Sequence, residues 1–94
     1  MDKYEILVPY HDNNGERFSK RMHHGWDEAV CQFTGGLMLR GIVKGKWGAK
    51  REKVIRVEIV CEADVMKKIA EFTKKHYDQE QVLYGKVCGP YELV

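Results

Sequence analysis

Apolar residues alternate with other residues near the start of the chain, and this period of two predicts a β-strand over residues 4–10. Leu7 falls on one face of that strand, and the opposite face carries Tyr4, Ile6, Val8 and Tyr10. Pro9 has no N–H to donate to a neighbouring strand, so we expect it at the strand's end. Residues 11–15 are rich in Asp, Asn and Gly and predict a turn.

A spacing of three and four residues follows the turn and predicts an amphipathic helix. The residues at this spacing are Phe18, Met22, Trp26, Val30 and Phe33. Ser19 is a candidate N-cap, but Gly25 costs about 1 kcal/mol relative to Ala inside a helix. We therefore expect the regular helix to begin only near His23 or His24. The glycines at 35–36 end it, because glycine readily adopts the left-handed conformation of a helix C-terminus.

The second half of the chain repeats the order of strand and helix. We expect a strand over residues 37–43, a Gly- and Lys-rich hairpin connection over 44–53, and a strand over 54–61. Asp64 opens a second helix, and residues 81–87 form the last strand. Clean alternation in the third strand indicates an antiparallel strand with one face on the core. Its apolar face carries Ile55, Val57, Ile59 and Cys61.

The element order predicts one α+β domain over residues 1–94, with the order β-α-β-β-α-β. Right-handed crossovers leave few topologies for this order. The best solution is the ferredoxin-like split βαβ fold, a four-stranded antiparallel sheet with two helices on one face. Its other face would stay bare, and exposed apolar patches usually mark an interface. Because twofold homodimers are the commonest oligomers, we expect a homodimer formed by sheet faces or edge strands.

Composition narrows the classes of partner. With 44% hydrophobic and 32% charged residues, the chain of 94 residues is typical of a soluble domain. A net charge of +2 is too weakly basic to favour a nucleic-acid binder. A dense basic run coincides with the hairpin connection, where a solvated turn is favoured over a phosphate-binding patch. The run comprises Lys44, Lys46, Lys50, Arg51 and Lys53.

The three cysteines are scattered and form no CxxC motif, so neither a zinc ribbon nor a redox pair is indicated. This pattern fits reduced thiols at Cys31, Cys61 and Cys88. The N-terminus shows no basic n-region followed by an apolar h-region, so we expect no signal peptide, and no apolar run approaches the ~20 residues of a membrane span. We therefore expect a cytoplasmic location, with no membrane, metal or cofactor.

Five residues are candidates for a ligand site. His23 and His24 are adjacent at the start of the helix. The favoured interpretation is that they are polar residues of the helix start without a catalytic role. The functional alternative is that one of them acts as a general acid or base. Trp47 lies in the hairpin connection, where it either fills the end of the core or lines a pocket. Tyr10 is a half-buried candidate beside them. Glu58 is favoured as a solvated cross-strand partner of a basic residue, although burial by a second copy would shift its pKa.

Several short motifs resemble a known group of proteins. They are residues 4–9, the spacing of His24 and Trp26, and the segments 35–36, 45–47 and 81–83. Together they resemble small uncharacterised bacterial α/β proteins, and the resemblance implies a ferredoxin-like fold without an assigned activity or catalytic residue. Acylphosphatases are similar in strand order, but their Gly-rich phosphate cradle is absent here. The half-polar sheet face is similar to that of dimeric α/β-barrel proteins, which include small monooxygenases.

The leading hypothesis is a small dimeric domain that binds a small ligand or a protein partner. An enzyme is the alternative, with a pocket enclosed by two sheet faces and with Glu58 and a histidine as acid and base. A third and weaker hypothesis is a nucleic-acid contact through the lysine-rich hairpin. The sequence leaves open whether the protein is an enzyme, because one fold hosts many functions.

Overall fold

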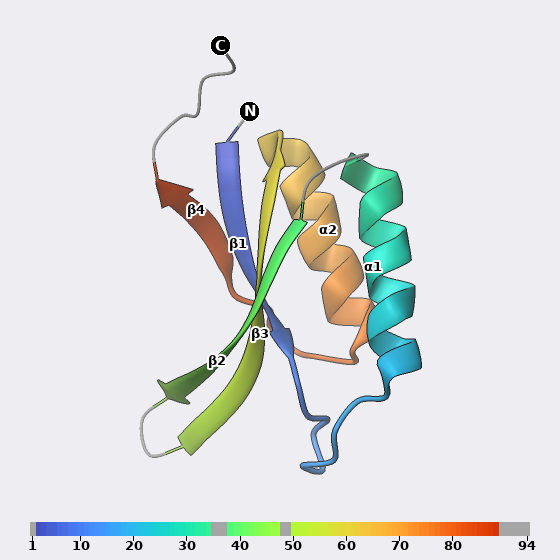
Figure 1. The fold of residues 1–94 in the computed structure, drawn as a ribbon, viewed down its shortest axis with the longest axis vertical. Helices are drawn as coiled ribbons and strands as arrows, with labels where there is room; N and C mark the ends of the chain where they lie inside the picture. Colours follow the sequence, from blue (N-terminus) through green and yellow to red (C-terminus); the bar gives the residue numbers. More distant parts are fainter. Residues whose placement is uncertain (1, 35–37, 48–49, 89–94) are drawn as a thin grey trace.

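The fold was obtained as a computed structural model that describes residues 2–34, 38–47 and 50–88; for residues 38–47, 50–52 and 88 it describes the backbone only. Both helices lie against the same face of an antiparallel sheet (Figure 1). The elements in chain order are β1 (Asp2–Pro9), α1 (Lys20–Thr34), β2 (Met38–Trp47), β3 (Lys50–Cys61), α2 (Ala63–His76) and β4 (Tyr84–Cys88). An α+β fold, as the sequence predicts, is therefore present.

The sheet has the strand order β2-β3-β1-β4, and every neighbouring pair is antiparallel. All eight residues of β1 pair with the stretch Val54–Cys61 of β3. The ten residues of β2 pair with β3 from Met38 opposite Ile59 to Trp47 opposite Lys50. These three long strands form the body of the sheet.

The predicted fold class is wrong in its fourth strand. In place of a regular strand over residues 81–87, β4 covers only Tyr84–Cys88 and pairs with β1 from Lys3 to Ile6. The register shifts between Lys3 and Tyr4, which interrupts even this short pairing. The sheet is thus a three-stranded antiparallel body with a short, irregularly paired fourth strand at its edge, in place of the four full strands that were predicted. The alternation of residues 81–84 misled the prediction, because strand preference depends on the neighbouring strand.

Other element boundaries also differ from the prediction. The expected hairpin connection is mostly strand, since β2 continues to Trp47 and β3 begins at Lys50. Helix α1 begins at Lys20, before the expected start near His23. The predicted cap is confirmed, because the Ser19 hydroxyl accepts a hydrogen bond from the Met22 N–H at 3.1 Å.

The core lies between the inner face of the sheet and the two helices. Strand β1 buries Tyr4, Ile6 and Val8 and turns Leu7 outward, as period-two alternation requires. The Trp26 indole donates a 2.7 Å hydrogen bond to the buried Thr73 hydroxyl, so both polar groups are satisfied between α1 and α2. The core is completed by Val30, Ile55, Val57, Ile59, Cys61, Met66, Ile69, Ala70 and Tyr77.

Candidate functional site

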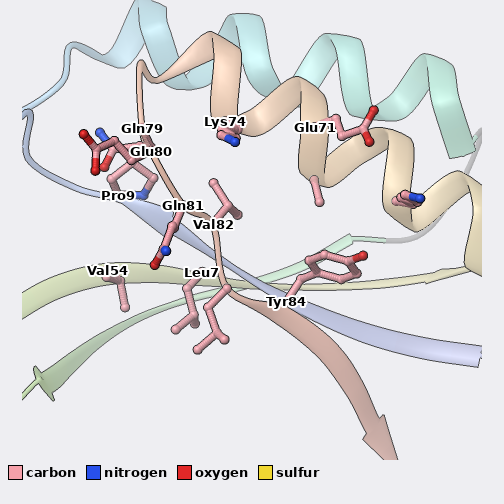
Figure 2. Close-up of a pocket in the computed structure, with 13 residues that line it drawn as sticks. Leu7, Pro9, Val54, Glu71, Lys74, Gln79, Glu80, Gln81, Val82 and Tyr84 are labelled. Atoms are coloured by element: carbon pink, nitrogen blue, oxygen red, sulfur yellow. The ribbon is translucent and has the colours of Figure 1, made fainter.

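A groove of about 680 Å³ runs between α2 and the segment that leads from α2 into β4. Figure 2 shows lining side chains on both sides of this segment: Lys74, Glu71 and Tyr84 lie toward α2, whereas Leu7, Val54 and Gln81 lie on the other side. The complete lining is Leu7, Pro9, Val54, Lys67, Ala70, Glu71, Lys74, Gln79, Glu80, Gln81, Val82, Leu83 and Tyr84.

The groove exists because β4 is short. Beyond Ile6 no strand pairs with the β4 side of β1 in the described residues, and one backbone hydrogen bond from Leu7 N–H to the Leu83 carbonyl, 3.0 Å long, holds the segment there. The end of α2 sets the direction of the segment. Asp78 adopts a left-handed φ of 52°, and the N–H of Gln79 donates to the Lys74 carbonyl at 2.9 Å. This pattern is a Schellman C-cap, which turns the chain sharply away from the helix.

The α2 wall of the groove is a helical stripe of mixed charge. Lys67, Glu71 and Lys74 are spaced four and three residues apart, so they share one face of the helix. Glu80 contributes a second carboxylate from the segment. The lining therefore combines two ammonium groups with two carboxylates. It suits a ligand that carries both a positive and a negative charge, or one with strongly polar ends.

The other walls of the groove offer apolar and aromatic surface. Tyr84 is 39% exposed and Leu83 is 53% exposed, so both present large apolar groups to the solvent. Gln79 and Gln81 add amide donors and acceptors. No Cys, His, Ser or Thr is among the described residues that line the groove. Its chemistry is that of recognition by stacking, ion pairing and amide hydrogen bonds.

Two of the sequence-predicted site residues meet elsewhere, at the N-terminal end of α1. The rings of Tyr10 and His23 stack with their centroids 6.5 Å apart. His23 Nδ1 shares a 2.7 Å hydrogen bond with the Tyr77 hydroxyl, which joins α1 to the residue after α2. The Tyr10 hydroxyl accepts a 3.3 Å hydrogen bond from Arg17, and the Lys53 ammonium lies 4.2 Å from the centre of the Tyr10 ring. These contacts hold His23 and Tyr10 within a packed cluster.

Glu58 belongs to a charged ladder on the outer face of the sheet, the face away from the helices. Its carboxylate contacts Lys3 at 2.7 Å and Arg56 at 2.8 Å, and Arg56 also contacts Glu5 at 2.6 Å. The hydrogen bond from Lys3 is the main cause that lowers the pKa of Glu58, with the charges of Lys3 and Arg56 adding to it. The hydrogen bond to Glu5 raises the pKa of Arg56. The ladder links β1 to β3 through ion pairs on the sheet surface.

The remaining candidates are His24 and Trp47. His24 is exposed on α1. Trp47 ends β2 opposite Lys50, and its side chain lies outside the described residues. The cysteine at 88 likewise has no described side chain, whereas Cys31 is exposed and Cys61 is buried. A role in ligand binding for any of the five predicted residues stays a prediction.

Metal ligands do not gather in the part of the chain that the structure describes. Within residues 2–34, 38–47 and 50–88, no group of three or more His, Cys, Asp or Glu residues is arranged to hold a metal ion. Neither α1 nor α2, the helices of the described residues, is long and apolar enough to cross a membrane.

Sequence reasoning missed the groove because its walls come from three separate stretches of chain. Val82 and Tyr84 were assigned to the middle of a regular strand, where no cavity is expected. The useful signal was the polar run at residues 78–81, which separates the end of α2 from the next apolar residues. Such a run indicates a loop, and a loop between a helix and an edge strand is a common place for a binding site.

The fold and the groove define a small α+β protein with a groove at one edge of its sheet. Comparison with known proteins finds no matching family model and no matching curated protein. Among solved structures, the chain is similar to a phage SAM lyase in complex with S-methyl-5'-thioadenosine, with a TM-score of 0.55 and 12% sequence identity. The match covers 87% of this chain and 76% of the lyase chain. At this identity the likeness is one of fold.

Proposed function

We propose that this protein binds a small molecule that combines a planar ring with a zwitterionic or strongly polar end, and that the groove beside α2 is its site. The observation that carries the proposal is the groove itself. Its volume of about 680 Å³ falls within the ~300–1,000 Å³ typical of ligand pockets. Its lining places an exposed aromatic ring and both signs of charge around one space.

Each wall has a part in this recognition. Tyr84 provides a ring face on which a planar heterocycle stacks, and Val82 and Leu83 extend that apolar surface. The ammonium groups of Lys67 and Lys74 attract a carboxylate or phosphate, while Glu71 between them attracts a cation. The amides of the segment fit the hydrogen-bonding edges of a heterocycle.

The structural neighbour supplies the first probe. The phage SAM lyase was solved with S-methyl-5'-thioadenosine, a nucleoside thioether with a planar ring and polar ribose. This supports testing nucleosides and nucleoside thioethers first, because a shared fold offers comparable places for a ligand even where the residues differ.

The test is calorimetric titration of the purified protein with S-methyl-5'-thioadenosine, which is uncharged, and with adenosine 5'-monophosphate, which adds a phosphate for Lys67 and Lys74. We expect saturable binding by the wild-type protein. Removal of a stacking ring costs about 1–3 kcal/mol per base, so Tyr84→Ala should weaken the affinity by about tenfold or more. The matched variants Lys67→Gln and Lys68→Gln each remove one charge from consecutive positions of α2, and only Lys67 lines the groove. We expect Lys68→Gln to bind as the wild type does.

Two results would contradict the proposal. One is an absence of saturable binding to either probe by the folded wild-type protein. The other is an equal loss of affinity for adenosine 5'-monophosphate in Lys67→Gln and Lys68→Gln, which would reflect the general charge of the protein and not a contact in the groove. Circular dichroism of each variant shows that the fold is intact.

A further inference from the structure

The β2–β3 hairpin extends past the rest of the sheet as a two-stranded ribbon. Pairing between β1 and β3 ends at Pro9 opposite Val54, whereas pairing between β2 and β3 continues to Trp47 opposite Lys50. We call residues 44–47 and 50–53 the basic ribbon. A solvated turn was the favoured sequence interpretation of this region, but a paired ribbon fixes which of its residues lie opposite one another.

The register of the basic ribbon places like charges directly opposite each other. Lys44 pairs with Lys53, and Lys46 pairs with Arg51. Because alternate residues share a face, these four register positions belong to one face of the ribbon. Glu52 pairs with Gly45 and therefore occupies a position of the other face. Like charges opposite each other destabilise a sheet, and a two-stranded hairpin is marginally stable by itself. An anionic partner would remove this repulsion.

Described cations continue this face onto the body of the protein. The Lys53 ammonium lies 4.2 Å from the centroid of the Tyr10 ring, and the Arg17 guanidinium carbon lies 5.9 Å from the same centroid. Figure 1 shows the β1–α1 connection and the ribbon at the same end of the molecule. The nearby Asp12 carboxylate accepts hydrogen bonds from the backbone N–H groups of Asn14 and Glu16. The Asp12 carboxylate therefore stabilises the turn of the β1–α1 connection.

We propose that the basic ribbon, together with Arg17, binds the phosphate backbone of a nucleic acid. Two residues along a strand rise about 6.8 Å, which is about the axial advance of two nucleotides at ~3.4 Å each. A regular polyanion thus meets successive basic pairs, and a two-stranded ribbon fits the major groove of DNA.

The test measures fluorescence anisotropy of a labelled 20-base-pair DNA duplex against protein concentration at several salt concentrations. With four or five cations engaged, the plot of log Kobs against log salt should fall with a slope of about −4. The double variant Lys46→Gln/Arg51→Gln should weaken binding by about tenfold and make the slope shallower by about 2. The control Lys68→Gln/Lys75→Gln removes the same charge from exposed positions of α2 and should leave the slope unchanged.

Three outcomes would overturn the proposal. The wild-type protein fails to bind the duplex at about 50 mM salt. The ribbon variant and the α2 control lose the same affinity. The protein binds vesicles containing phosphatidylserine but not the duplex, which would assign the ribbon to a membrane surface. Thermal unfolding of both variants confirms that they are folded, and none of these outcomes depends on the groove beside α2.

Discussion

Gly25 shows how one residue balances helix stability against packing. It lies inside α1, and a Cβ placed there would stand 3.4 Å from Cε1 of His76 on α2. The His76 ring is itself fixed, because its Nε2 donates a 2.8 Å hydrogen bond to the Met22 carbonyl. A methyl group at position 25 therefore reaches ordinary contact with α2 and does not clash with it.

We expect Gly25→Ala to stabilise the protein. Ala is about 1 kcal/mol more favourable than Gly in a helix interior, and the added methyl group comes into van der Waals contact with His76. Urea unfolding should show a gain of about 0.5–1 kcal/mol. Gly15→Ala is the matched control, because Gly15 has a φ of +84° that Ala adopts only with strain. The packing account is wrong if Gly25→Ala destabilises the protein as much as Gly15→Ala does.

Single residues were predictable where the cause is local. The Ser19 cap depends on residues three positions apart, so the sequence contains the whole signal. The hydrogen bond between His23 and Tyr77 joins residues 54 positions apart, so no local sequence pattern predicts it. The helix start was placed too late because the cost of Gly25 was weighed without the packing against α2 that offsets it.

Between elements, the charged ladder of β1 and β3 ties two long strands together. Glu5 lies directly opposite Glu58 in the register, which alone would be repulsive. Arg56 bridges the two carboxylates by ion pairs with both, and Lys3 forms an ion pair with Glu58. Glu58 is only 14% exposed, so it depends on these partners more than an open surface carboxylate would. The ladder makes the pairing of these strands sensitive to acid.

We expect part of the protein's acid sensitivity to come from Glu58. Its pKa is lowered in the folded state, so its stabilising effect is complete above the ordinary pKa of about 4.3 and is lost as the pH falls through the lowered value. Glu58→Gln should therefore lower the free energy of unfolding at pH 7 and flatten its dependence on pH below about 5. Urea unfolding from pH 3 to 7 measures how the free energy of unfolding depends on pH. Glu28→Gln, at an exposed position of α1, should keep the wild-type slope, and equal slopes in all three proteins would refute the role of Glu58.

Most elements were predictable from periodicity, but several of their ends were not. The alternation in β1 and β3 gave their faces correctly, because buried and outward residues differ clearly in polarity. The ends of β2 and β4 depend on pairing with other strands. The Gly- and Lys-rich stretch after position 43 reads as a turn in isolation, yet its backbone pairs as far as Trp47 opposite Lys50. Residues 81–83 read as a strand, yet β4 begins only at Tyr84.

At the scale of the whole molecule, the short β4 links the fold to the proposed site. Pairing of β4 ends at Tyr84 opposite Ile6, and the groove occupies the space along Leu7 and Pro9 beyond that point. A longer β4 would close it. Sequence reasoning could not find this site, because it depends on where a strand stops pairing and on a helix that begins 54 positions after the end of β1. The predicted homodimer, formed by the outer sheet face or by edge strands, stays a prediction.

The groove and the basic ribbon assign two separate surfaces to two kinds of ligand. The groove lies between α2 and the segment before β4, whereas the ribbon extends beyond β1 from the other edge of the sheet. Binding at one surface therefore needs no residue of the other, and the variants of each serve as folded controls for the other.

The most direct measurement of the central claim is a titration of ¹⁵N-labelled protein with S-methyl-5'-thioadenosine, followed by amide chemical shifts. Binding in the groove predicts saturable shifts along Lys67–Lys74 and Gln79–Tyr84, with little change around Tyr10 and His23. Shifts confined to the cluster of Tyr10 and His23, or the absence of any saturable shift, would contradict the assignment of the groove as the ligand site.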